Sequence, residues 1–111
     1  MNGANFLTER EEKTLNSFST QLKAALGENL VLIKLIGSKA RGDFTEDSDL
    51  DVLIVVKEYI FKEKVYDILF SVDPYYETKI SPIIYSAYEY QRNKELESPF
   101  IECIERGGIN L

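Results

Sequence analysis

The chain has 111 residues, enough for one domain around one hydrophobic core, and we expect residues 1–111 to form that single domain. Its 13 basic and 19 acidic side chains give a net charge of −6, which repels polyanions and makes direct nucleic-acid binding unexpected. The absence of histidine excludes histidine-based triads and histidine-containing zinc sites, and a single cysteine, Cys103, excludes an intrachain disulfide.

The first half of the chain predicts a helix and two strands. Thr8-x-x-Glu11 is a capping box, Gly27 suits the helix end, and between them apolar residues recur at helical spacing, at Leu15, Phe18, Leu22 and Leu26. The segments 30–36 and 50–56 are nearly continuous apolar runs, which indicates strands covered on both faces. Between the two strands, residues 39–41 predict a short helix.

The second half predicts a further helix over 61–72, a strand over 76–85 after the break at Asp73-Pro74, and a polar helix over 87–96. Ser98-Pro99 begins a last amphipathic helix that ends at Gly107-Gly108, and within it we expect Cys103 to be a small buried residue. This order predicts an α+β domain, a small sheet with helices mainly on one face. No apolar run reaches membrane-spanning length and no signal peptide is evident, so we expect a cytoplasmic protein without membrane contact.

One segment of the sequence contains the residues of a candidate functional site. Gly37-Ser38 is followed after ten residues by Asp49-Leu50-Asp51, where the second predicted strand begins. Residues i and i+2 of a strand share a face and lie roughly 6.5 Å apart, so Asp49 and Asp51 present paired carboxylates. Mg²⁺ is usually held by one or two carboxylates together with substrate phosphates. The Gly-Ser turn can offer backbone N–H groups to phosphate oxygens, so the segment predicts a nucleotide-handling site.

The fuller pattern, Gly-Ser-x-Ala-Arg-Gly at 37–42 and Ser-Asp-x-Asp at 48–51, resembles the DNA polymerase β-type nucleotidyltransferases, in particular the minimal nucleotidyltransferases of bacteria and archaea. The resemblance implies a nucleotidyltransferase fold with a mixed sheet and a Mg²⁺-dependent transfer of AMP from ATP. It assigns the metal to Asp49 and Asp51 and the phosphates to Gly37 and Ser38.

Three neighbours of the motif have less specific expectations. Arg41 either pairs with phosphate or fixes the loop by bonding Asp43 or Asp47, and both interpretations stay open. Lys39 is expected to be a solvated lysine. Gly42 is expected to supply a turn with positive φ.

The third acidic residue of the superfamily, which sits on a later strand and deprotonates the attacking hydroxyl, has no clear counterpart. The best alignment places Ser81 there, and serine is no base at neutral pH without activation. Glu77 is the alternative on the same predicted strand, about 13 Å from Ser81.

Two functions follow. The first is an adenylyltransferase whose acceptor comes from a partner or a second subunit; the resemblance implies a HEPN-domain protein, in a toxin–antitoxin pair. The alternative is a catalytically weakened module that neutralises or regulates a partner by contact, and Ser81 favours it. A subunit of a larger transferase that receives its third carboxylate in trans is a third reading, and homo-oligomerisation stays open.

Overall fold

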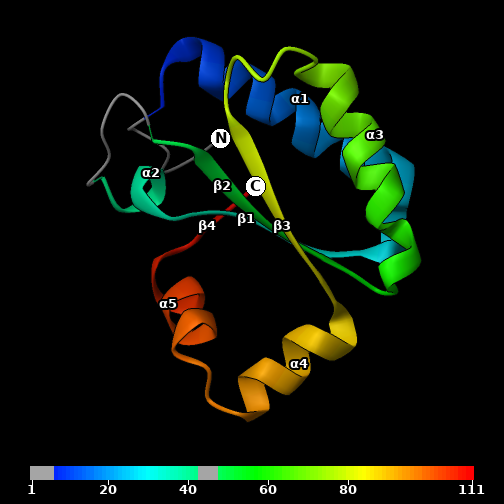
Figure 1. Ribbon diagram of the computed structural model, residues 1–111, viewed down its shortest axis with the longest axis vertical. Coiled ribbons are helices and arrows are strands. Elements are labelled where there is room, and N and C mark those ends of the chain that lie inside the picture. The colour runs from blue at the N-terminus through cyan, green and yellow to red at the C-terminus, as the bar shows by residue number, and fades with distance from the viewer. Residues whose placement is uncertain (1–6, 43–47) are drawn as a thin grey trace.

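The structure, a computed structural model, describes residues 7–42 and 48–111 (Figure 1). The helices are α1 (Glu9–Leu26), α2 (Ser38–Arg41), α3 (Lys62–Val72), α4 (Ala87–Glu95) and α5 (Pro99–Gly107). The strands are β1 (Leu30–Ile36), β2 (Leu50–Val56), β3 (Ile80–Ser86) and β4 (Ile109–Asn110). Short 3₁₀ turns, η1 (Gly27–Asn29) and η2 (Tyr59–Phe61), precede β1 and α3.

The described strands form one mixed sheet in the order β3-β2-β1-β4. β1 pairs antiparallel with both β2 and β4, whereas β2 and β3 are parallel. The parallel pair is possible because α3 crosses between them, as such connections usually require. The predicted α+β class and mixed sheet are thereby confirmed.

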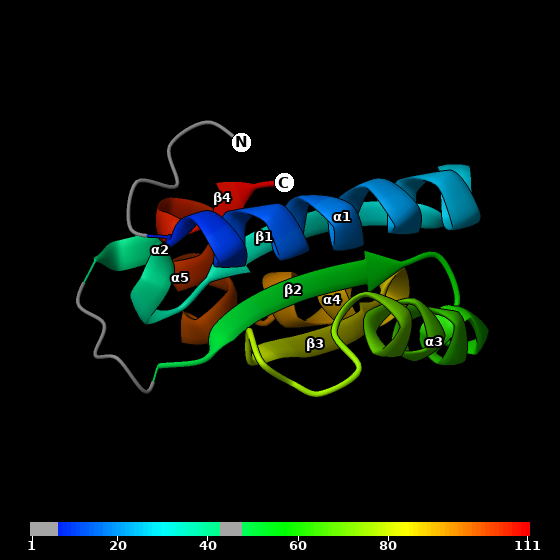
Figure 2. The same ribbon diagram turned by 90° about the horizontal axis from the view of Figure 1, so that it is seen from above.

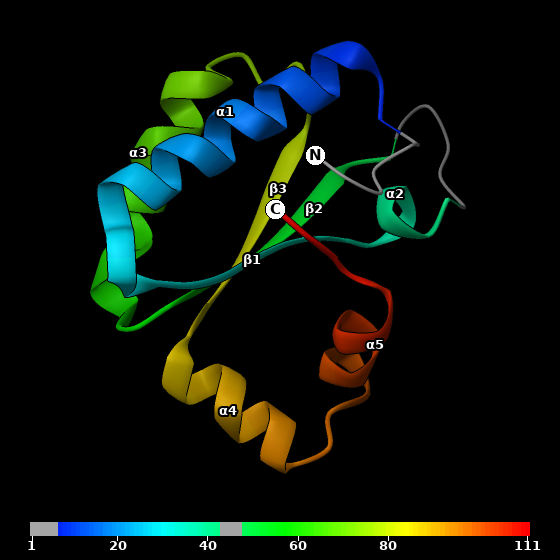
Figure 3. The ribbon, with the colours of Figure 1, turned by 180° about the vertical axis from the view of Figure 1, so that it is seen from behind.

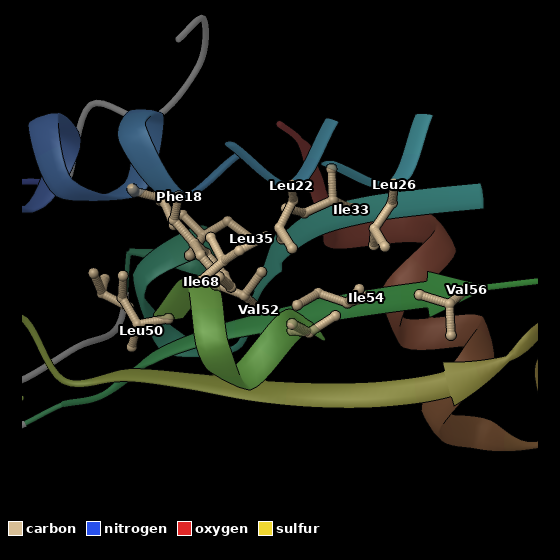
Figure 4. Packing of buried hydrophobic residues seen from close by; sticks show 13 residues of the cluster. Phe18, Leu22, Leu26, Ile33, Leu35, Leu50, Val52, Ile54, Val56 and Ile68 are labelled. Carbon is tan, nitrogen blue, oxygen red and sulfur yellow. The ribbon is translucent and has the colours of Figure 1, made fainter. Parts of the chain in front are cut away.

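Helices cover both faces of the sheet (Figures 1 and 2). The two longest helices, α1 and α3, pack on one face over alternate β2 residues, and Figure 4 shows this main core, which includes Phe18, Leu22, Leu35, Leu50 and Val52. On the other face, α5 sets Ile101 and Ile104 against Ile36, Leu53 and Val55. The expectation of helices mainly on one face is thus refined: α4 and α5 form a second, smaller layer, seen from behind in Figure 3. Both faces of β2 are consequently buried, as its apolar run predicted.

Short-range sequence patterns predicted the position of most helices and strands. Thr8 caps α1 through the predicted capping box with Glu11, and Leu15, Phe18 and Leu22 are fully buried. β1 and β2 have the predicted bounds. Pro99 occupies the first turn of α5, although the Ser98 side chain forms no capping hydrogen bond.

The third strand begins later than predicted, at Ile80 instead of Tyr76. The Asp73 carboxylate accepts hydrogen bonds from the backbone N–H of Glu77 at 3.0 Å and from the Thr78 hydroxyl at 2.7 Å. These bonds hold residues 73–78 in a turn, and Tyr76 and Lys79 have positive φ, which interrupts extended backbone. Within the described ranges, no helix is both long and apolar enough to cross a membrane.

Candidate functional site

Asp49 and Asp51 flank the first residue of β2. Leu50 between them is fully buried in the core under α1 and α3, which leaves Asp51 on the opposite face of the sheet, the face of α5. Asp51 is partly buried and pairs in register with Ile36 of β1 and with Ser81 of β3. Asp49 is exposed and precedes the strand. Both carboxylates act electrostatically on the same nearby phenol, that of Tyr76, so the structure brings them to one place.

Gly37 brings the end of β1 against Asp51. A Cβ atom built on Gly37 would lie 2.5 Å from Oδ2 of Asp51, closer than real contacts allow, and Gly37 has a φ of +76°. Glycine is therefore required twice, for the left-handed backbone and for the close approach. This close approach is to a carboxylate of the site itself, and the predicted phosphate contact of Gly37 stays a prediction.

α2 begins directly after Gly37 and carries Ser38 and Arg41. Only the backbone of these two residues is described, so the predicted phosphate contacts of Ser38 and Arg41 stay predictions. Asp43 and Asp47, the alternative partners of Arg41, lie outside the described residues. Gly42 has a φ of +87°, which confirms the predicted turn.

Lys39 is not the solvated lysine that the sequence suggested. It is 5% exposed, and its ammonium lies 3.2 Å from Oε1 of Glu11 in a largely buried ion pair. The same Glu11 oxygen accepts the backbone N–H of Thr8 in the capping box. Lys39 therefore fastens α2, and with it the turn at Gly37, to the first turn of α1.

Ser81 and Glu77, the two candidates for the third-carboxylate position, lie in different settings. Ser81 is the in-register neighbour of Asp51 on the adjacent strand, so their side chains share a face about 4.8 Å apart. Glu77 lies in the turn before β3 and not on the strand, and its carboxylate forms an ion pair with Arg10 of α1. The prediction that Glu77 lies on the same strand as Ser81 is wrong, because the bonds to Asp73 hold Glu77 and Thr78 in a turn and the strand begins only at Ile80.

Tyr76 is a site residue that sequence reasoning missed. Its phenol lies within electrostatic reach of Asp49 and Asp51. Partial burial, followed by the negative charges of Asp49 and Asp51, raises the pKa of the Tyr76 phenol, which stays protonated at neutral pH. The only local signal for this turn in the sequence was the break at Asp73-Pro74. The approach of Tyr76 to Asp49 depends on how the turn over residues 73–78 packs against β2.

A pocket of about 400 Å³ opens between the sheet and α5, beside the same carboxylate. Asp51 and Gly37 line it, and the other lining residues are mostly apolar: Ile36, Ile83, Pro99, Phe100, Cys103, Ile104, Gly107 and Gly108. Cys103 is exposed, contrary to the expectation of burial, because Ile101 and Ile104 are the α5 residues that turn toward the sheet. The volume is within the range of small-molecule sites.

The donor set suits a hard cation that is only partly held by protein. Among the described residues, no three acidic, cysteine or histidine side chains gather into a complete metal site. Asp49 and Asp51 supply two carboxylates, which matches Mg²⁺, a cation that keeps waters and takes further oxygens from substrate phosphates.

Comparison with known proteins identifies the family of the chain. The sequence model of the family described as "Nucleotidyltransferase domain" matches residues 13–105. "Putative protein adenylyltransferase MJ0141" of Methanocaldococcus jannaschii is 35% identical over 100 residues, which cover 87% of this chain and 94% of that protein. "Putative protein adenylyltransferase MJ0604" of the same organism is 49% identical over 45 residues, 40% of this chain and 45% of that protein.

A crystal structure of "a putative nucleotidyltransferase from Sulfolobus solfataricus" aligns with 25% identity and a TM-score of 0.42, over 81% of this chain and 85% of that one. The family match spans most of the chain, and the MJ0141 protein matches over nearly its full length. The chain belongs to the nucleotidyltransferase domain family of the DNA polymerase β-like superfamily, and it is a nucleotidyltransferase.

Proposed function

We propose that the chain transfers AMP from ATP to a hydroxyl group of a protein, with Mg²⁺ at Asp49 and Asp51. The observation that carries this proposal is the meeting of Asp51, Gly37 and the apolar pocket at one edge of the sheet. The protein acceptor is supported by the likeness to the MJ0141 and MJ0604 proteins, whose names describe protein adenylyltransferases.

Each described residue has a separate task in this reaction. Asp49 and Asp51 hold the cation, which when bound neutralises charge on the phosphate oxygens and the departing pyrophosphate. The turn at Gly37 presents backbone N–H groups of α2 to the triphosphate, and Ser38 and Arg41 are placed beside it along the chain. The pocket under α5 has room for the adenosine, with Asp51 among the residues that line it.

The proposed acceptor is a hydroxyl of a partner protein or of another subunit, a choice supported by the likeness to the MJ0141 and MJ0604 proteins. A HEPN-domain protein in a toxin–antitoxin pair, as implied by the family resemblance, is the partner that we propose to test first.

A binding module that acts by contact is the second candidate. Ser81 favours it, because the in-register neighbour of Asp51 supplies no carboxylate to take the acceptor proton. In that case nucleotide still binds, but neutralisation of the partner requires no transfer.

Labelled ATP distinguishes the two. The purified chain is incubated with ATP labelled in the α-phosphate, Mg²⁺ and a lysate of its own cells, and labelled proteins are then sought. The double variant Asp49→Asn, Asp51→Asn should lose on the order of 10³-fold or more in transfer rate, since one electrostatic donor alone can contribute 10²–10³-fold. Asp67→Asn, which removes an exposed charge on α3, is the control and should transfer normally.

Protection of cells from the partner adds a second readout. If the double variant transfers nothing but still protects cells that express the partner, the chain acts by contact. Full transfer by the double variant would contradict the assignment of Asp49 and Asp51.

A further inference from the structure

Phe100 is the aromatic residue that lines the pocket between α5 and the sheet. Phe100 is 39% exposed, and of the exposed large apolar residues in the described part of the chain it alone lines this pocket. Tyr88 of α4 belongs to the same helical layer and is more exposed, but it does not line the pocket. An accessible aromatic ring in the wall of a small-molecule pocket offers a flat apolar surface to a ligand.

Two further aromatic rings hold the Phe100 ring in place. The ring centroid of Tyr85, on β3, lies 6.4 Å from that of Phe100, and the two rings are tilted by 60°. The Tyr90 ring of α4 lies 6.5 Å from that of Tyr85. Tilted pairs at such separations are favourable for aromatic side chains. The Phe100 ring is therefore positioned before a ligand arrives, and little conformational entropy is lost when the ligand binds.

The distance between Phe100 and the carboxylate of the site suits a nucleotide. Asp51 is in register with Ser81 of β3, and Tyr85 lies four residues further along that strand. Four residues of a strand span roughly 13 Å. Phe100 contacts Tyr85, and Ile83, which lines the pocket, lies between the two positions on the same face of the sheet. A nucleotide with its phosphates at Asp51 would therefore place its base toward Phe100.

The pocket offers a base few side chains that could pair with its edge. Among the lining residues, Asp51 has the only charged side chain and is proposed to hold the cation. The thiol of Cys103 is a weak hydrogen-bonding group, and the other lining residues are apolar or glycine. Contact with the ring face is the interaction that remains for the base. Because apolar burial grows with the area of the ring, a purine gains more from it than a pyrimidine.

We propose that Phe100 binds the base of the nucleoside triphosphate by stacking, and that this contact makes the site prefer purine to pyrimidine nucleotides. The inference rests on the proposed function, because it concerns the same nucleotide at the same carboxylates. Phe100 touches the base and not the phosphates. Its loss therefore changes the affinity for nucleotides and leaves the affinity for the triphosphate group unaltered.

Calorimetric titrations with three ligands in Mg²⁺ separate stacking from support of the fold. Tripolyphosphate has the phosphates without a base, CTP has a pyrimidine and ATP has a purine. Phe100→Leu keeps an apolar side chain without the ring, and should weaken ATP binding about tenfold, the order that stacking on an aromatic side chain supplies. It should weaken CTP binding less and leave tripolyphosphate binding unchanged.

Phe100→Tyr, which keeps the ring, and Tyr88→Leu, which removes a ring outside the pocket, are the controls and should bind all three ligands as the wild-type chain does. Phe100→Leu that binds ATP as tightly as wild type would overturn the proposal. Weaker binding of all three ligands by the same factor would also overturn it, because a purely structural role of Phe100 predicts that result.

Fluorescence reports the contact directly. The chain contains no tryptophan, so Phe100→Trp introduces a single indole at the proposed contact. ATP should change its emission with the Kd that calorimetry gives, tripolyphosphate should not, and Tyr88→Trp should respond to neither ligand. Phe100→Trp that binds ATP without any change in emission would overturn stacking. If the larger ring prevents folding or ATP binding, the Phe100→Leu and Phe100→Tyr titrations decide.

The transfer assay separates this inference from the function beneath it. Phe100→Leu should raise the KM for ATP and leave kcat near the wild-type value, since the base contact is the same in the ground state and the transition state. A wild-type chain that transfers AMP, with KM and ATP affinity unchanged in Phe100→Leu, would overturn the role of Phe100 and leave the proposed function standing. A wild-type chain that binds neither ATP nor tripolyphosphate in Mg²⁺ would overturn both.

Discussion

At the scale of single residues, the contact between Gly37 and Asp51 decides the shape of the site. A side chain at Gly37 would meet Oδ2 of Asp51 and would also be strained by positive φ. The steric contact would displace the Asp51 carboxylate, whereas the positive φ would strain only the backbone. The chain offers a means of separating them, because Gly27 has a φ of +54° with no heavy atom within 4 Å of an added Cβ.

We therefore predict different outcomes for Gly37→Ala and Gly27→Ala. Each should lose stability because alanine is strained at positive φ, at a cost on the order of 1–3 kcal/mol, which in a domain of this size lowers the melting temperature by several degrees. Gly37→Ala should lose more, and should also weaken ATP binding, because Asp51 has to move. Calorimetric melting and ATP titration of both variants check this. Unchanged ATP affinity in Gly37→Ala would show that the Asp51 position does not matter for the nucleotide.

The neighbour of Asp51 on β3 determines the second prediction at this scale. In Ser81→Asp a third carboxylate would stand in register beside Asp51. Like charges on adjacent strands repel, so the variant should melt lower without metal, gain more stability from Mg²⁺ and transfer AMP faster. Ser81→Asn, which has about the size of Ser81→Asp without the charge, is the control and should gain no more stability from Mg²⁺ than the wild-type chain does.

Glu77→Gln completes this test. Glu77 lies before β3 and pairs with Arg10, so its loss should weaken that contact and leave the transfer rate unaltered. Loss of transfer in Glu77→Gln, with no gain in Ser81→Asp, would move the third-carboxylate role from Ser81 to Glu77.

At the scale of the elements, the ion pair of Lys39 and Glu11 joins the phosphate turn to α1. Lys39→Met leaves the partly buried Glu11 without this cation, and breaking such a pair costs up to about 3–5 kcal/mol. Chemical denaturation should show this loss, and ATP affinity should fall because α2 is less firmly placed. The double variant Lys39→Met, Glu11→Gln should recover part of the stability, since glutamine keeps the cap without the charge. A single variant as stable as wild type would contradict the role of the pair.

The pocket between α5 and the sheet gives a prediction that depends on an exposed thiol. Cys103 lines this pocket and is the single cysteine of the sequence. If adenosine occupies the pocket, ATP with Mg²⁺ at about 100 times its Kd should slow alkylation of Cys103 by up to ~100-fold. Maleimide labelling followed by mass measurement checks this. The Asp49→Asn, Asp51→Asn protein should show no protection, and equal rates with and without ATP in the wild type would place the nucleotide elsewhere.

Sequence patterns located the elements where the determining interactions are local. The capping box at Thr8, the apolar runs of β1 and β2 and the proline at the start of α5 all act within a few residues, and each prediction was confirmed. β4 was missed because a two-residue strand has no periodicity of its own and exists only by pairing with β1.

The residues of the candidate site differ in the same respect: local spacing predicted some of them, and distant elements position the others. The paired aspartates and Gly37 lie close together in the sequence, so their spacing predicted their meeting. The burial of Lys39, the exposure of Cys103 and the approach of Tyr76 to Asp49 each depend on a distant element or on a turn whose backbone no local pattern determined. Such contacts were beyond reach without the structure.

At the scale of the whole molecule, charge decides how ATP can bind. The net charge is −6, and Lys39, a cation of the motif itself, is already paired with Glu11. Two like charges 4 Å apart near a protein surface repel by about 4 kcal/mol, so a triphosphate at Asp49 and Asp51 meets a large unfavourable field. A divalent cation held by Asp49 and Asp51 would reverse the sign of that field.

We therefore predict that ATP binds at least about tenfold more tightly in Mg²⁺ than in EDTA, a difference of 1.4 kcal/mol or more. Calorimetric titration under the two conditions measures it. In Asp51→Asn the difference in ATP affinity should be smaller for two reasons. In EDTA the nucleotide meets one negative charge fewer and binds more tightly. In Mg²⁺ the site holds the cation less well, so the nucleotide binds more weakly. Asp67→Asn also removes one negative charge, but on α3 and away from the site, and should keep the full difference. Equal affinity in Mg²⁺ and EDTA for the wild-type chain would mean that Asp49 and Asp51 do not hold a cation for the nucleotide.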